Sequence, residues 1–268
     1  MLVKIDGRDL HCDVVGDEAA PVVCLAHALS ADGSIWAEQV APLLEDGWRV
    51  LRLDMRGHGG SEAGDENYSM AALAQDVAAI LDFLEIGKVH FVGLSIGGMI
   101  GQTFALDHPD RIHSLMLCGT APAALDGGME ELWNPRFAAI AEAGSVEPLA
   151  AATMERWFTP AFRVHRPNRW EQVYQTICRT TPAGYRGGGI AIDTYDVVAR
   201  LPSLRVPTLV LCGDGDTGTP PAGNRRIAQL VPDATYVEME NARHIPMVEY
   251  PEQYAAILRK WLSANRQD

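Results

Sequence analysis

HFVGLSIGGMIGQ, residues 90–102, is the stretch that decides the fold of this chain. It holds a Gly-x-Ser-x-Gly motif at residues 93–97, between an apolar run typical of a strand and a pattern typical of a helix. A serine in this context sits on a sharp, strained turn, because the flanking glycines lack the Cβ atoms that would collide there. A helix N-terminus beside the hydroxyl favours negative charge. On its own the motif fits any tight turn, but between a strand and a helix it predicts that Ser95 is a nucleophile.

Outward from this motif, strands and helices alternate along the chain. The predicted strands are Leu2–Ile5, Leu10–Val15, Pro21–His27, Trp48–Asp54, Val89–Leu94, His113–Gly119, Val206–Gly213 and Ala234–Glu240. The predicted helices are Ser69–Glu85, with Ser69 as N-cap and Gly87 as the stop, Ile96–Asp107, Pro221–Leu230 and Pro251–Ala264. This order predicts an α/β protein, with a mostly parallel central sheet covered by helices on both faces.

The rhythm changes between about Ala121 and Arg200, where Pro, Gly and aromatic residues become frequent and no long apolar strand is present. Short helical patterns, such as Glu147–Phe158 and Arg169–Arg179, occur there instead. We therefore predict a helical lid, residues 123–198, inserted into a core that is formed by residues 1–122 and 199–268.

Composition excludes several classes of protein. The formal net charge of -13 over 268 residues disfavours nucleic acid and anionic membranes as partners, and no apolar run approaches the length of a membrane span. No cysteine pair has metal-ligand spacing, and Gly187-Gly188-Gly189 follows no strand, so neither a metal nor a nucleotide cofactor is expected. We expect a cytoplasmic protein with reduced thiols that acts on a small molecule.

A serine nucleophile needs a base, and the base needs an acceptor that orients it. On a strand–turn–helix scaffold of this kind the chain order is serine, acid, histidine. Asp216, in CGDGDTGTPP (residues 212–221), and His244, in ENARHIPMVEYPE (residues 240–252), satisfy that order. Asp214 is the alternative acid. Structural roles are expected for six other histidines, namely His11, His58, His90, His108, His113 and His165.

The oxyanion that forms on an attacked carbonyl needs preorganised backbone donors. The N–H of Ile96, directly after the nucleophile, is one candidate. The N–H of Leu29, in LAHALSADGSIW (residues 25–36), is the second candidate, although that segment also fits a simple connecting loop.

Five segments resemble the α/β-hydrolase superfamily: DMRGHGGS (54–61), VGLSIGGMIGQ (92–102), HPDRIHSLMLC (108–118), GDGDTGTPP (213–221) and ARHIPMVEYPE (242–252). Other stretches resemble 3-oxoadipate enol-lactonase of the β-ketoadipate pathway: HALSADGSIW (27–36), Trp133 with Arg136, ERWFTPAF (155–162) and GYRGGGIAID (184–193). The resemblance implies cofactor-free hydrolysis of an enol-lactone from aromatic-acid breakdown. It also implies a Ser95–Asp216–His244 triad with Leu29 and Ile96 as oxyanion donors.

The sequence departs from that family's pattern at two places, which comprise three residues. His27-Ala28 stands where its members usually carry Asn-Ser, and Ile96 stands where many carry Met. Both changes leave the backbone donors intact and bear on which lactone is used.

The function expected from the sequence is hydrolysis of a small lactone or ester through an acyl-enzyme. A general carboxylesterase, a cofactor-free perhydrolase and a carbon–carbon bond hydrolase are alternatives on the same fold, and a slow-turnover receptor is an alternative from another class. An anionic substrate would need a local cation in this acidic protein. Arg136, one helical turn after Trp133, is the candidate, and a solvated surface arginine is the alternative reading.

Overall fold

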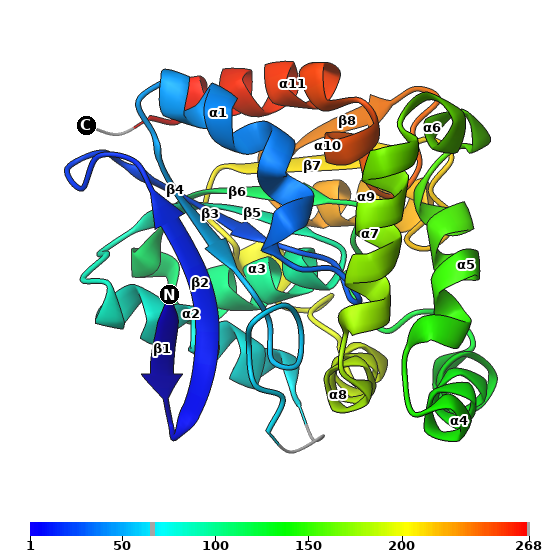
Figure 1. The fold of residues 1–268 in the computed structure, drawn as a ribbon. Helices are drawn as coiled ribbons and strands as arrows, with labels where there is room; N and C mark the ends of the chain where they lie inside the picture. The colour runs from blue at the N-terminus through cyan, green and yellow to red at the C-terminus, as the bar shows by residue number, and fades with distance from the viewer. Residues whose placement is uncertain (65–67, 267–268) are drawn as a thin grey trace.

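The computed structural model describes residues 1–64 and 68–266, and its described strands form one eight-stranded sheet (Figure 1). The strand order is β1-β2-β4-β3-β5-β6-β7-β8. β2 pairs antiparallel with β1 and β4, and the remaining neighbours are parallel. The strands are β1 (Leu2–Ile5), β2 (Arg8–Val15), β3 (Val22–Ala26), β4 (Arg49–Leu53), β5 (Val89–Leu94), β6 (Ile112–Cys118), β7 (Thr208–Gly213) and β8 (Thr235–Met239).

The middle of the sheet is buried on both faces. Every residue of β3, β5 and β7 is buried, which explains why these strands are continuous apolar runs in the sequence. Figure 1 shows α1 (Ala37–Glu45) and α11 (Pro251–Ala264) together above the sheet, and α2 (Met70–Phe83) and α3 (Ile96–Asp107) below it. The predicted α/β architecture, with helices on both faces, is confirmed.

The chain between β6 and β7 is helical, as expected for an inserted lid. Its helices are a π-helix (Gly128–Trp133), α4 (Asn134–Ala143), α5 (Glu147–Trp157), α6 (Pro160–His165), α7 (Pro167–Arg179) and α8 (Pro182–Asp193), and a 3-10 helix (Leu201–Ser203) precedes β7. Figure 1 shows α4, α5, α7 and α8 gathered to the right of the sheet. Thr181 ties α8 to the core, because its N–H and its hydroxyl both donate to the Gly57 carbonyl. The exact lid boundaries, 123 and 198, stay a prediction.

One local expectation needs correction. The helix α2 ends at Phe83 rather than at Glu85, because Glu85 takes a left-handed backbone (φ 54°) and the N–H of Ile86 closes the turn onto Leu81. Ser69 does cap the start of this helix, accepting from the Ala72 N–H. The segment after β3 holds a 3-10 turn and the helix α1, which has Pro42 inside it.

Helices α9 (Pro221–Leu230) and α10 (Pro246–Glu249) complete the C-terminal half. Both follow strands at the carboxyl edge of the sheet, where the loops after β5, β6, β7 and β8 meet. In open parallel sheets this edge is where ligands bind.

The turn between β5 and α3 is the most constrained of these loops. Ser95 has φ 58° and ψ -119°, a backbone conformation that residues other than glycine rarely adopt. A Cβ on Gly97 would lie 2.5 Å from the Ala26 carbonyl oxygen, and a Cβ on Gly93 would overlap the Gly97 carbonyl. The two glycines of the motif are therefore required by the close approach of β3, β5 and α3.

We expect Gly97→Ala to lower the free energy of unfolding by about 1–3 kcal/mol, the usual range for overpacking a buried site. Gly87→Ala is the matched control, because a Cβ there meets no atom within 4 Å and the residue is exposed. Urea denaturation of both variants measures the difference. Equal stability of the two variants would contradict the packing argument.

Candidate active site

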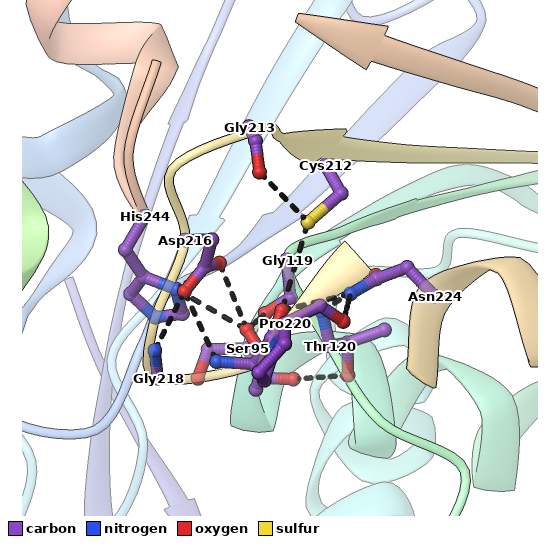
Figure 2. A network of polar contacts seen from close by, with 11 residues as sticks. Ser95, Gly119, Thr120, Cys212, Gly213, Asp216, Gly218, Pro220, Asn224 and His244 are labelled. Atoms are coloured by element: carbon purple, nitrogen blue, oxygen red, sulfur yellow. Dashed lines mark hydrogen bonds and ion pairs between the residues drawn. The ribbon is translucent and has the colours of Figure 1, made fainter. Parts of the chain in front are cut away.

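The predicted acid and base form a buried pair at the carboxyl edge of the sheet. His244 Nδ1 lies 2.7 Å from Asp216 Oδ2, and both side chains are buried (Figure 2). Asp216 follows β7 and His244 follows β8. The other oxygen of the carboxylate accepts the backbone N–H groups of Gly218 and Thr219, at 2.9 and 3.0 Å. A carboxylate held in this way fixes the imidazole through its Nδ1 and leaves Nε2 for chemistry.

Asp216 stays ionised despite its burial. Burial raises the pKa of its carboxyl group, but the nearby His244 and the hydrogen bonds from His244 and Thr219 outweigh burial and leave that pKa below its ordinary value. Asp214, the alternative acid, is exposed. The structure thus pairs His244 with Asp216.

Ser95 and His244 line the same cavity. Ser95 comes from the strained turn, and Figure 2 shows it in one cluster with Asp216 and His244. The structure therefore brings together the three side chains that the sequence nominated from positions 95, 216 and 244.

A chain of buried hydrogen bonds connects the serine turn to the acid loop (Figure 2). The Thr120 hydroxyl donates to the Ser95 carbonyl at 2.7 Å, and the Thr120 N–H donates to Asn224 Oδ1 at 2.9 Å. Asn224 Nδ2 donates to the Thr219 carbonyl at 3.0 Å, and the Thr219 hydroxyl lies 3.0 Å from Asp216 Oδ2. This network holds the loops after β5, β6 and β7 in one arrangement.

Sequence reasoning missed these supporting residues. Thr219 could have been suspected, because it stands three positions after the acid. Thr120 and Asn224 carry no local signal, since the hydrogen bond between them joins positions 104 residues apart along the chain.

The role of Leu29 and Ile96 as oxyanion donors stays a prediction, and the structure shows where the two residues lie. Ile96 is the first residue of α3, and Leu29 lines the cavity with Ser95. Among the described residues, neither N–H takes part in a hydrogen bond of a turn, loop or cap, whereas the N–H of Ser30 is taken by His58. The segment around Leu29 is thus held in a specific conformation by hydrogen bonds from its neighbours, and is more than a connecting loop.

Two histidines shape that loop. His58 Nε2 accepts the Ser30 N–H while Nδ1 lies 2.9 Å from the Arg56 carbonyl. Burial and the neighbouring His27 lower the pKa of His58 to about 3, so it is neutral and can accept. His27 Nε2 accepts the Met55 N–H at 2.9 Å. The histidine that departs from the family pattern therefore joins the loop after β3 to the loop after β4.

The cavity has a volume of about 700 Å³ and lies between the strand ends and the lid. Both predicted substrate-binding residues, Trp133 and Arg136, line it. The Arg136 guanidinium lies 5.4 Å from the centre of the Trp133 ring, the geometry expected of a cation–π contact. Trp157 also lines the cavity, with its ring centre 6.3 Å from that of His244.

Metal binding and membrane insertion each place a requirement on the side chains or helices of residues 1–64 and 68–266. No group of three or more His, Cys, Asp or Glu side chains in these ranges is arranged to hold a metal ion. No helix in the same ranges has the length and apolar character that crossing a membrane requires. All five cysteines are free thiols.

The fold and this site define a hydrolase of the α/β type. A family model described as the alpha/beta hydrolase fold matches residues 21–251, and the chain belongs to that family. The resemblance to 3-oxoadipate enol-lactonases is likewise confirmed. "3-Oxoadipate enol-lactonase 1" of Acinetobacter baylyi is 31% identical, over 96% of this chain and 94% of the relative.

Two solved structures are similar over their whole length. The enol-lactonase of Burkholderia xenovorans LB400 superposes with a TM-score of 0.93 at 35% identity, covering 98% of this chain and 100% of that one. A thermophilic esterase of Thermogutta terrifontis, solved with malate bound, has a TM-score of 0.92 at 28% identity and covers 100% of both chains.

We expect Asp216→Asn to lower kcat by about 10³- to 10⁴-fold, because an amide no longer holds the imidazole in the required tautomer. Asp214→Asn is the matched control on the same loop and should retain activity near that of the parent. Steady-state kinetics on any substrate that the protein turns over compares them. A larger loss for Asp214→Asn would reassign the acid.

Asn224→Ala should lower kcat by about 10- to 100-fold with little change in KM, because small misplacements of catalytic groups are costly. The control is Ser114→Ala, which removes another buried hydrogen bond, to His90, far from the cavity. Kinetics well below both melting temperatures separates misplacement from lost stability. Similar fractional losses in the two variants would leave Asn224 with a purely structural role.

Proposed function

We propose that this protein is a serine hydrolase that cleaves a small lactone or carboxylic ester through an acyl-enzyme, with 3-oxoadipate enol-lactone as the first candidate substrate. The observation that carries the proposal is the buried Asp216–His244 pair, of which His244 borders the same cavity as Ser95, a serine on a strained turn. Nucleophile, base and orienting acid are the set that acyl transfer needs.

In the first half-reaction, Ser95 Oγ attacks the substrate carbonyl while His244 Nε2 takes the hydroxyl proton. The carbonyl oxygen becomes an oxyanion, which the N–H groups of Leu29 and Ile96 stabilise. Collapse breaks the ring C–O bond, and His244 returns the proton to the leaving oxygen. In a lactone the leaving oxygen stays tethered to the acyl group, so the whole substrate remains on Ser95.

In the second half-reaction, His244 removes a proton from water, and the resulting hydroxide attacks the acyl-enzyme. The second oxyanion collapses, the bond to Ser95 Oγ breaks and His244 protonates the serine. A carboxylic acid is released. The charge of Asp216 stabilises the imidazolium that exists twice in this cycle.

Two observations support an enol-lactone as substrate. Relatives named as enol-lactonases cover nearly the whole chain, and Trp133 and Arg136 line the cavity as the resemblance implies. The substrate's carboxylate needs a cation to offset its desolvation in a protein of net charge -13, and Arg136 supplies one. Such a substrate would place the enzyme in aromatic-acid breakdown.

A general carboxylesterase is the second candidate. A cavity of about 700 Å³ lies in the range that holds drug-sized ligands, so it has room for esters larger than a six-carbon lactone. The similarity to a thermophilic esterase supports the same candidate.

Covalent labelling and turnover test the proposal together. Mass spectrometry should show one covalent adduct of an organophosphonate probe on the parent protein and none on Ser95→Ala. The turnover of Ser95→Ala should be lower by several orders of magnitude. Multiple-turnover kinetics on lactones and esters, followed by titration of the acid released, ranks the two substrate classes. Labelling that persists in Ser95→Ala would move the nucleophile, and release of only one equivalent of product would favour a receptor.

A further inference from the structure

A second arginine, Arg156 on α5, lines the cavity together with Arg136 on α4. These two helices are consecutive and packed together in the lid. Both arginines are half-buried, and both share the cavity with Ser95 and His244. The cavity therefore has two cationic side chains on its lid wall, of which the sequence nominated one.

The surroundings of Arg156 hold it toward the cavity without neutralising it. Its guanidinium donates to the Thr153 hydroxyl at 3.0 Å, and Thr153 also lines the cavity. Tyr185 lies beside both arginines: burial raises the pKa of its hydroxyl, and the charges of Arg136 and Arg156 oppose that rise. These contacts are with neutral groups, so they orient the guanidinium and leave its charge in place.

No carboxylate pairs with either guanidinium within the described residues. The ion pairs found there involve other arginines, such as Arg169 with Glu38 and Arg259 with Asp46. Asp126 and Asp196 line the same cavity but form no ion pair with Arg136 or Arg156. In a protein with 35 acidic and 22 basic residues, two neighbouring arginines without an acid are unexpected.

The positive charges of Arg136 and Arg156 are unfavourable for each other. Burial lowers the pKa of Arg156, and the like charge of Arg136 lowers it further. An anion placed between the two groups would offset both effects through charge-assisted hydrogen bonds.

We propose that Arg136 and Arg156 together form an anion subsite that binds a free carboxylate of the substrate, and that Arg156 makes the enzyme prefer esters and lactones carrying one. Two guanidinium forks match the planar pair of oxygens in a carboxylate. A doubly charged phosphate fits less well, because Asp126 and Asp196 border the same cavity in an acidic protein. This inference rests on the proposed function. It specifies that the substrate carries a negative charge and that Arg156 recognises this charge.

The test uses two esters that differ only in charge: monomethyl adipate, with one free carboxylate, and dimethyl adipate, with none. Arg156→Gln removes the charge and keeps a polar side chain of similar reach. We expect it to lower kcat/KM about 10- to 100-fold for the monoester and to change the diester by less than about twofold. Arg156→Lys, which keeps the charge but loses the fork, should fall between the parent and Arg156→Gln.

Arg163→Gln is the matched control. Arg163 is also a lid arginine with a ring beside it, 5.5 Å from the centre of Trp170, but it borders a different hollow on the outside of the lid. It should leave the ratio of the two esters unchanged. Equal losses on both esters in Arg156→Gln, or no loss on the monoester, would overturn the subsite.

A binding measurement keeps this inference separate from the proposed function. Calorimetry of adipate with the parent and with Arg156→Gln needs no turnover, and we expect weaker binding in the variant. If neither ester shows turnover that depends on Ser95, the proposed function fails, whereas the adipate result still decides the subsite. Equal adipate affinity in the two folded proteins would remove Arg156 from it. If Arg156→Gln does not fold, Arg156→Lys decides by the same comparison.

Discussion

The left-handed backbone of Ser95 is the constraint on which the rest of the site depends. A serine at φ 58° exists only because β5 ends against α3 with no Cβ at Gly93 or Gly97 to separate them. This conformation costs free energy, which the packing of the surrounding sheet supplies. It also aims one side chain away from the buried strand and toward the loops that follow the other strands.

The parallel sheet brings the residues of other loops next to the Ser95 turn. Because β5, β6, β7 and β8 run in the same direction, their following loops meet at one edge, although the loop after β5 and the loop after β8 lie more than 100 residues apart in the sequence. Asn224 and Thr120 then tie the serine turn to the acid loop through buried hydrogen bonds. Buried networks of this kind rigidify a site when every member has a partner.

In the proposed function, the lid contributes positive charge and the core contributes the reacting groups. Ser95, Asp216 and His244 stand on loops of the sheet, whereas Arg136 and Arg156 stand on helices between β6 and β7. With this division, changes in the lid sequence can alter which substrate is preferred while the core retains the same reaction. One fold can serve many substrates in this way. The anchoring of the lid fits that role, because Arg243, next to His244, donates to the Phe158 carbonyl at the end of α5.

The sequence by itself determined the fold class and nominated Ser95, Asp216 and His244, because these features are local. A buried parallel strand is an apolar run, and the serine turn is a short glycine motif in a strand–helix context. The order of acid and histidine follows from the order of the strands. Trp133 and Arg136 were nominated through a resemblance, and the structure places both in the cavity.

Only the tertiary structure decided which groups surround these residues. It paired His244 with Asp216 and left Asp214 exposed. It also showed that the backbone N–H of Ser30 donates a hydrogen bond to His58. It also introduced Asn224 and Thr120, which no pattern in the sequence singled out, and it brought Arg156, one residue of the ERWFTPAF stretch, to the cavity. The physical reason is that their roles depend on contacts with distant segments and on the absence of an acidic neighbour, and neither property is local to the chain.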